Sequence, residues 1–249
     1  MDCFAPRNVC TAGRGRSAGK RITLGGEYLS LFDPDSGTDT RLTEDGRLKR
    51  SPTWSPDGRR VAYMTFNPND DIQVLSLDGD AKPRALVATD AIERDPAISP
   101  DGKWLAFLST SSADVAGKTN VYVVRFPEGT GKTQITANGG GRPFWSRDGR
   151  ELFFPAPPGV IQAVSIAPGD RLQIGAARTL FPLENLRIVG VAPDGRFLSF
   201  REPRQDPETE IVVVQNWLQE LNRLVKKFQR ASGPARASAR DRSLASSET

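Results

Sequence analysis

Short apolar runs separated by polar turns follow one another from about residue 22 to residue 215. They are four to six residues long and rich in β-branched and aromatic side chains, which is typical of β-strands. One set of equivalent runs covers residues 60–64, 103–108, 151–154 and 196–200. A second set covers residues 72–77, 121–126, 160–164 and 211–214, and a weaker third set covers residues 84–87, 133–136 and 178–181. The pattern therefore predicts a unit of about four strands that repeats along the chain.

A turn sequence recurs once in each unit and links the first strand of the unit to the second. It reads Ser55-Pro56-Asp57-Gly58, Ser99-Pro100-Asp101-Gly102, Ser146-Arg147-Asp148-Gly149 and Ala192-Pro193-Asp194-Gly195. The four aspartates are 44, 47 and 46 residues apart, a period typical of propeller blades. Proline presets φ, aspartate suits the next position and glycine accepts a positive φ, so these residues form turns. We therefore interpret the aspartates as turn formers and expect no metal site from them.

The two ends of the chain depart from the repeat. Residues 28–37 and 40–43 look like the last two strands of a preceding blade whose first two strands are missing. Residues 1–21 lack periodicity and predict a disordered basic leader. Residues 216–230 place apolar side chains at helical spacing and predict one amphipathic helix, which we expect to pack on the last blade. Residues 231–249, dominated by Ala, Ser and Arg, predict a disordered tail.

The net charge of +4 does not indicate nucleic-acid binding, because the positive charge lies at the ends. Residues 1–21 and residues 217–249 each carry +4, so the body between them carries −4. A nucleic-acid partner would favour a basic patch on the fold itself. No run approaches the roughly 18 apolar residues of a membrane helix, and the N-terminus lacks the apolar stretch of a secretory signal. As written the chain reads as cytoplasmic, without membrane insertion.

Catalytic and metal-binding signals are weak. The chain has no histidine, which removes Ser-His-Asp and Cys-His catalysis and the commonest metal ligand. Cys3 and Cys10 both lie in the leader and support neither a disulfide framework nor a zinc site. Residues 15–19 match Gly-x-Ser-x-Gly, and residues 129–133 look like part of a phosphate-binding loop, but neither has the required strand and helix around it. We expect no enzyme activity, no cofactor and no metal.

Residues 52–63 and 96–107 repeat one phrase, Pro-x-x-Ser-Pro-Asp-Gly-x-x-x-Ala-aromatic. This phrase, with its period, resembles the TolB-like, WD40-like (PD40) β-propeller repeat over residues 22–215. The resemblance implies an all-β fold of about four full four-stranded blades plus a half blade, incomplete or open, followed by the helix. Related propellers are often periplasmic. Residues 212–221 also resemble the end of propellers that act as sensor regions of bacterial serine/threonine kinases, although the kinase motifs themselves are absent.

One group of residues remains as a candidate binding site. Arg50, Arg94 and Arg187 stand seven residues before the turn aspartates, and Arg142 lies one position off this register. In a propeller the strand ahead of the turn is the innermost, so these arginines would gather at one mouth of the channel and suit a carboxylate or an acidic peptide. The alternative is that each arginine pairs with a nearby acid such as Glu93 or Asp95, or is simply solvated.

The sequence thus favours a non-catalytic β-propeller module for protein–protein interaction or ligand sensing. Its partner would be a protein or peptide, and open blade edges favour self-association. One alternative is an accessory or sensor propeller of a larger enzyme, either a serine/threonine kinase or a prolyl-oligopeptidase-type peptidase. Another is a remnant without an independent role. The residues leave the partner, the ligand and the true compartment undetermined.

Overall fold

A computed structural model describes residues 21–201 except residues 25, 68, 80–81, 111–117, 168 and 193. Of residues 2–4, 9–11, 67 and 69 it describes the backbone alone. The chain divides into two units, Met1–Pro203 and Arg204–Thr249, and all the described residues belong to the first. The predicted strand at 211–214, the helix at 216–230 and the tail at 231–249 lie outside the described residues.

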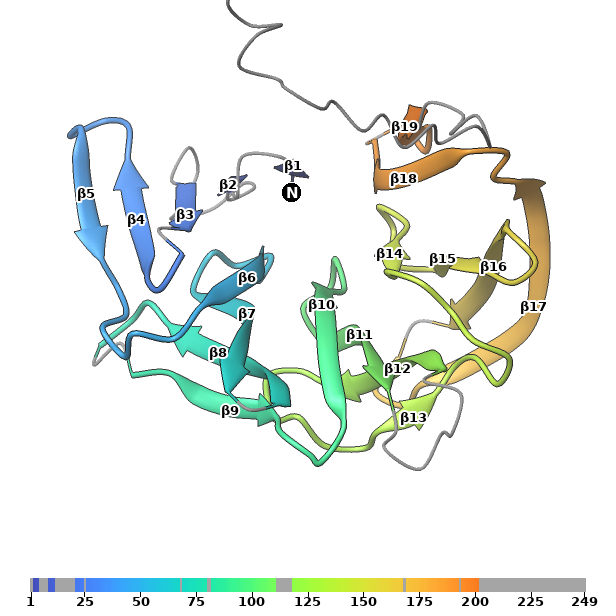
Figure 1. Cartoon of the computed structure of the whole chain (residues 1–249), viewed down its shortest axis with the longest axis horizontal. Helices are drawn as coiled ribbons and strands as arrows, with labels where there is room; N and C mark the ends of the chain where they lie inside the picture. Colours follow the sequence, from blue (N-terminus) through green and yellow to red (C-terminus); the bar gives the residue numbers. More distant parts are fainter. Residues whose placement is uncertain are drawn as a thin grey trace, which may run out of the picture. The chain divides into compact units, whose positions relative to one another are not determined.

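All the described regular structure is β, in five antiparallel sheets whose strands follow sequence order (Figure 1). The first sheet contains β1 (Asp2–Phe4), β2 (Val9–Thr11), β3 (Arg21–Leu24), β4 (Leu29–Asp33) and β5 (Thr38–Arg41). The second contains β6 (Lys49–Trp54), β7 (Arg60–Asn67), β8 (Asn69–Ser76) and β9 (Arg84–Val87). The third contains β10 (Ile92–Ile98), β11 (Trp104–Thr110), β12 (Thr119–Arg125) and β13 (Thr133–Gln134). The fourth contains β14 (Phe144–Trp145), β15 (Glu151–Ala156), β16 (Val160–Ala167) and β17 (Gln173–Pro182), and the fifth contains β18 (Leu186–Val191) and β19 (Phe197–Arg201).

The first sheet corrects the expectation of a half blade without its first two strands. β3 pairs with β4, with Ile22 opposite Leu31, and β2 and β1 continue the sheet beyond β3. Ile22 is fully buried, which anchors β3 in this sheet. No Ser-Pro-Asp-Gly turn precedes β4, so the turn pattern gave no sign of these strands. Residues 1–21 were expected to lack regular structure, and the structure describes β1 and β2 among them.

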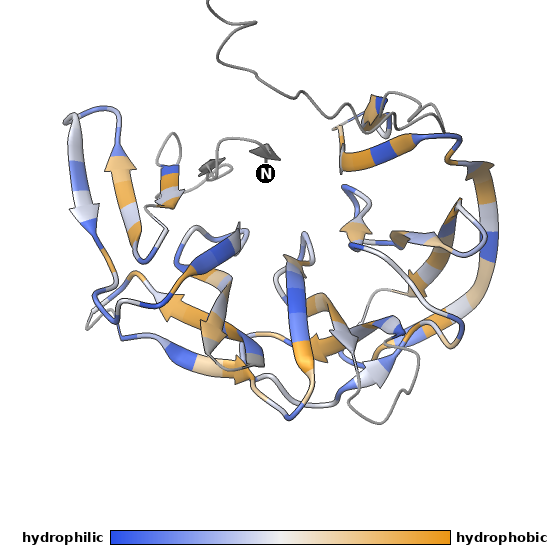
Figure 2. Ribbon diagram, viewed as in Figure 1, coloured by the Kyte–Doolittle hydropathy of each residue, from blue (hydrophilic) through white to orange (hydrophobic). Residues whose placement is uncertain are grey.

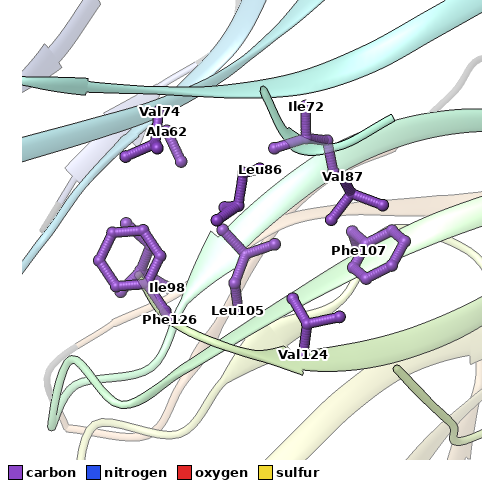
Figure 3. Packing of buried hydrophobic residues seen from close by; sticks show 10 residues of the cluster. All are labelled: Ala62, Ile72, Val74, Leu86, Val87, Ile98, Leu105, Phe107, Val124 and Phe126. Carbon is purple, nitrogen blue, oxygen red and sulfur yellow. The ribbon is translucent and has the colours of Figure 1, made fainter. Parts of the chain in front are cut away.

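Successive sheets pack face to face, which is the arrangement of propeller blades. Side chains of the second and third sheets form one buried cluster, and Figure 3 shows them facing one another, with Ala62, Ile72 and Val87 on one side and Leu105 and Phe107 on the other. Similar clusters join the first sheet to the second, the third to the fourth and the fourth to the fifth. Both faces of the second, third and fourth sheets are therefore buried, and Figure 2 shows apolar residues along their central strands.

In three blades the serine of the turn holds the hairpin in register. In the second sheet the Ser55 hydroxyl accepts a hydrogen bond from the Arg60 backbone N–H at 2.9 Å and donates to the Asp57 carboxylate at 2.5 Å. The Asp57 carboxylate in turn accepts from the Arg59 backbone N–H at 3.0 Å. Ser99 and Ser146 make the equivalent two bonds in the third and fourth sheets. These aspartates are thus turn residues, as predicted.

The fifth sheet lacks this serine, and its register differs by one residue. The backbone N–H of Ser55 donates to the carbonyl of Arg60, whose repeat equivalent in the fifth sheet is Phe197. The backbone N–H of Ala192 instead donates to the carbonyl of Arg196, one residue earlier. The hairpin loop is therefore one residue shorter, and Val191 lies opposite Phe197 instead of opposite Leu198. A slip of one residue turns every side chain of a strand to the other face. The methyl group of Ala192 cannot make the hydrogen bonds that hold the longer loop in the other blades.

Candidate binding site at one end of the inner strands

The first strand of each repeat unit lies next to its counterpart in the neighbouring unit. β10 contacts both β6 and β14, and β14 contacts β18. Figure 1 shows β6, β10 and β14 as the edge strands on one side of their sheets. We call β6, β10, β14 and β18 the inner strands. Because all four run in the same sense in the repeat, residues near their first positions gather at one end, opposite the Asp-Gly turns.

The structure places the four predicted arginines at this end. Arg50 lies in β6, Arg94 in β10 and Arg187 in β18, while Arg142 stands two residues before β14. The guanidinium of Arg50 lies over the Phe66 ring, 5.0 Å from its centroid. That of Arg142 lies over the Phe144 ring at 5.6 Å. We call these four residues the inner-strand arginines.

Arg94 differs from the others because it is already paired. Its Nε lies 2.5 Å from Oδ2 of Asp70, a nearly fully buried carboxylate at the start of β8. The partner is therefore neither Glu93 nor Asp95, the acids that the sequence suggested, but an acid of the neighbouring sheet. Among the described residues, Arg50, Arg142 and Arg187 make no ion pair with an acid. The predicted group of four arginines is thus uneven, because the charge of Arg94 is neutralised by Asp70.

Two residues next to the arginines have an unusual backbone. Ser51 follows Arg50 with φ of 48°, and Asp95 follows Arg94 with φ of 51°. Non-glycine residues in this left-handed region cost of order 1–3 kcal/mol each and often occur at binding sites. The Ser51 hydroxyl donates to the Asp95 carboxylate at 3.0 Å and links the two inner strands. Both residues lie where the pairing of the inner strand with its neighbour shifts register.

Two buried charges support this end of the inner strands, and the sequence analysis did not single them out. Lys49 is fully buried; its ammonium donates to the Glu27 and Arg47 carbonyls at 2.9 and 2.8 Å and pairs with the Asp45 carboxylate. This lysine ties the loop between the first two sheets to β6. The sequence indicates such a buried charge only in that a charged residue, Lys49 or Glu93, directly precedes Arg50 or Arg94.

The second buried charge is Glu93. Its Oε1 accepts from the Thr89 hydroxyl at 2.5 Å and lies 3.7 Å from the Lys132 ammonium. Its Oε2 has no hydrogen-bond partner among the described residues. Burial raises the pKa of the Glu93 carboxyl, because the charged form loses its hydration. Lys132 also lies over the Tyr122 ring at 4.7 Å, so it is held in place beside the acid.

A hollow of about 400 Å³ opens at the same end, between the third and fourth sheets. It is lined by the Asn138–Gly141 loop, Pro155–Pro157, Gly159, Leu183, Lys118 and Thr119. Gly140 and Gly141 occupy the repeat positions held by Lys49 and Arg50 in β6, so the hollow lies where other blades carry long side chains. The glycines are required by close packing: a Cβ on Gly140 would lie 2.8 Å from Val121 Cγ2.

The described residues show no other chemistry at this site. In residues 21–201, apart from the gaps given above, no group of three Asp, Glu or Cys side chains is placed to hold a metal ion. The described part also contains no helix of the length and hydrophobicity needed to cross a bilayer. What the site offers is guanidinium groups held by aromatic rings, beside a hollow with a largely apolar lining.

Comparison with known proteins yields relatives in sequence and in fold. The Tol-Pal system protein TolB of Thioalkalivibrio sulfidiphilus is 39% identical over 64 residues, which are 24% of this chain and 15% of that protein. TolB from Acinetobacter baumannii superposes with a TM-score of 0.58 at 19% identity, over 72% of this chain and 44% of that chain. A puromycin-hydrolyzing peptidase of Mycobacterium tuberculosis superposes with a TM-score of 0.59 at 21% identity, over 77% of this chain and 33% of that chain.

These relatives are longer than the part that matches. The chain spans less than half of the TolB structure and a smaller share of the TolB sequence. At these identities the structural similarities show the fold alone. The PD40 family model, described as the TolB beta propeller domain, matches residues 23–159, more than half of the 249 residues. Five antiparallel sheets that pack face to face agree with that match, and this chain belongs to the TolB β-propeller domain family.

Proposed function

We propose that this chain is a non-catalytic propeller module that binds an acidic segment of a protein partner at the inner-strand arginines. The observation that carries the proposal is the placement of Arg50 and Arg142 over Phe66 and Phe144 with no acid paired to them in the described part of the chain. A guanidinium that stacks on a ring keeps its edge N–H groups available for a carboxylate.

The hollow adds selectivity to this charge-based contact. It lies next to Arg142 on the chain, at Gly140 and Gly141, and proline and leucine contribute to its walls. An extended peptide with an apolar side chain next to a carboxylate would place the side chain in the hollow and the carboxylate on Arg142. The partner is thus an acidic peptide with at least one apolar residue.

A binding assay with defined probes tests this proposal. The probe is a fluorescein-labelled decapeptide of alternating glutamate and leucine, and the comparison probe replaces glutamate by glutamine. Fluorescence anisotropy would give the affinity of the full chain for each. Replacing both Arg50 and Arg142 by alanine should weaken binding of the glutamate probe about 5- to 30-fold, equivalent to about 1–2 kcal/mol. The glutamine probe should respond little.

The matched control removes the same charge at the opposite end of the inner strands. Arg59→Ala with Arg150→Ala changes two arginines that follow the Asp-Gly turns, and it should leave probe binding unchanged. Arg94 is left intact because its loss would strand the buried Asp70 carboxylate without its partner. Equal weakening by both double variants would mean that net charge alone attracts the probe, and the proposed site would then be wrong.

A second candidate function is the accessory propeller of a larger enzyme. The similarity to the puromycin-hydrolyzing peptidase favours it, because this chain covers 33% of that peptidase chain. Mass spectrometry of the native protein purified from its source would decide. A polypeptide much heavier than 27.1 kDa with a hydrolase domain would support this function, whereas a mass of 27.1 kDa would support the stand-alone module.

A further inference from the structure

The second and fourth sheets place charged side chains at equivalent positions near the Asp-Gly turn. Arg60 on β7 and Glu151 on β15 each stand three residues after the turn aspartate. Arg84 on β9 and Arg178 on β17 also correspond, because both lie opposite the same repeat position of the strand beside them. In each blade two charged side chains therefore flank the same middle strand, β8 in the second sheet and β16 in the fourth.

In the fourth sheet these two side chains form an ion pair. Oε1 of Glu151 accepts a hydrogen bond from a guanidinium N–H of Arg178 across β16. Side chains at these two positions are thus long enough to meet over the middle strand. In the second sheet both positions hold arginine, Arg60 and Arg84, so two guanidinium groups extend to one region, where like charges repel.

Both arginines of the second sheet line one small hollow of about 70 Å³. Lys82 brings a third positive charge to this hollow, Ser76 brings a hydroxyl group, and Val74 completes the described lining. A water molecule takes up about 30 Å³ in the liquid, so the hollow has room for about two waters or for one small ion. We call it the β7–β9 hollow.

The acids near the β7–β9 hollow leave most of its charge unpaired. Oδ2 of Asp57 lies 3.5 Å from a guanidinium nitrogen of Arg60, while the same carboxylate also holds the turn. Asp78 pairs instead with Arg59, at 3.3 Å. The other two cations of the hollow make no ion pair with any described residue. In the described part of the chain, three cations therefore share one carboxylate.

The hydrogen-bond donors of the hollow are partly fixed and partly adjustable. One guanidinium N–H of Arg84 donates to the Pro127 carbonyl of the third sheet, which holds this side chain in place. A guanidinium has five N–H donors in a rigid plane, so others remain for a ligand. The Ser76 hydroxyl lies 3.4 Å from the Asp78 carbonyl, a long contact that the hydroxyl can exchange for a ligand. A fixed guanidinium with spare donors is suited to an oxyanion.

We propose that the β7–β9 hollow is an anion site that binds a phosphate group, either inorganic phosphate or the terminal phosphate of a small monoester. A phosphate monoester carries about −1.5 to −2 charge at pH 7 and three strong acceptor oxygens, which match two guanidinium groups, an ammonium and a hydroxyl. A carboxylate has one charge and two oxygens and would leave more of the positive charge unpaired. The bound phosphate takes the place that Glu151 has in the fourth sheet, between the two outer positions of the blade.

This site is separate from the proposed peptide site. Arg60 follows the Asp-Gly turn, whereas Arg50 and Arg142 lie at the opposite end of the inner strands. The inference rests on the comparison of two blades and not on the peptide-binding proposal. Arg50→Ala with Arg142→Ala should therefore bind phosphate as the wild type does, whether or not that variant has lost the peptide.

Isothermal titration calorimetry of the full chain with inorganic phosphate, at constant ionic strength set by sodium chloride, tests the site. We expect saturable binding with a Kd of about 1 mM or tighter. Arg84→Gln should weaken binding at least about 10-fold, because it removes a charge-assisted contact. Arg178→Gln is the matched control: it removes the same charge at the equivalent position of the fourth sheet and should leave the affinity unchanged.

Arg84→Glu supplies a second readout that does not depend on a loss of folding. It places a carboxylate across β8 from Arg60, which is the ion pair of the fourth sheet with its charges exchanged. This variant should fold, melt at a higher Tm than the wild type in phosphate-free buffer, and gain no stability from phosphate. The Tm of the wild type should rise with phosphate, since a ligand that binds the folded state stabilises it.

Glycerol phosphate in place of inorganic phosphate separates the two sources of the group. Tighter binding of the monoester would identify a phosphorylated small molecule as the ligand, and tighter binding of the free ion would identify inorganic phosphate. Absence of saturable binding of either up to about 20 mM would overturn the proposal. Equal weakening by Arg84→Gln and Arg178→Gln would also overturn it, because phosphate would then respond to net charge alone.

Discussion

Removal of the turn serine in the third blade tests the account of hairpin register. Ser99 is almost fully buried, and its hydroxyl accepts from the Trp104 backbone N–H at 2.9 Å and donates to the Asp101 carboxylate at 2.5 Å. Ser99→Ala leaves a buried N–H without a partner, which costs about 1–3 kcal/mol. It also removes a hydrogen bond to a charged group, worth about 1.5–3 kcal/mol. Because the two bonds share one hydroxyl, we expect a combined loss of about 3 kcal/mol.

Urea denaturation measures this loss directly, and calorimetry supplies a second readout. For a domain of this size about 3 kcal/mol corresponds to a fall in Tm of about 6–12 °C. Ser165→Ala is the matched control, since Ser165 is exposed on β16 and the same replacement should change stability by less than about 0.5 kcal/mol. If Ser99→Ala costs no more than the control, the serine does not hold the register, and Ala192 cannot explain the slip in the fifth sheet.

Three further predictions follow from the buried acid, the close-packed glycine and the slipped hairpin. Burial raises the pKa of Glu93, so the folded state binds its proton more tightly than the unfolded state, and stability is lost as the pH rises between the two pKa values. Glu93→Gln should abolish this loss. Urea titrations at pH 4 to 8 in which the wild type and the variant lose stability in parallel would contradict this prediction. Gly140→Ala should destabilise by about 1–3 kcal/mol because its Cβ would meet Val121, whereas Gly190→Ala, with open space around it, should cost at most about 1 kcal/mol in thermal unfolding. Ala192→Ser supplies the missing hydroxyl and should slow amide hydrogen exchange in β19; unchanged exchange would show that another contact sets this register.

The repeat architecture was predictable because its signals are local. The strands predicted at residues 60–64, 103–108 and 151–154 lie within or largely overlap β7, β11 and β15. The four Asp-Gly turns stand where the spacing placed them, since a turn depends on the φ preferences of a few adjacent residues. β3 was not predicted, because no Asp-Gly turn connects it to its partner β4.

The candidate site was predictable in position but not in detail. Counting seven residues back from each turn located Arg50, Arg94 and Arg187 at one end of the inner strands, because the repeat fixes their register. It could not show that Arg94 pairs with Asp70, which lies 24 residues away on the neighbouring sheet. Nor could it show the hollow at Gly140, since a hollow is defined by side chains from several strands.

The β class, the blade period, the turn chemistry and the family resemblance could be read from the sequence, because each depends on residues that are near one another in the chain. The face that each strand presents became visible only in the folded structure. Leu198 and Phe200 occupy the same repeat positions as buried residues of the other blades, yet they face away from the fourth sheet. The physical reason is that the face of a strand depends on its register, and here one missing hydroxyl at Ala192 accompanies a slip of one residue.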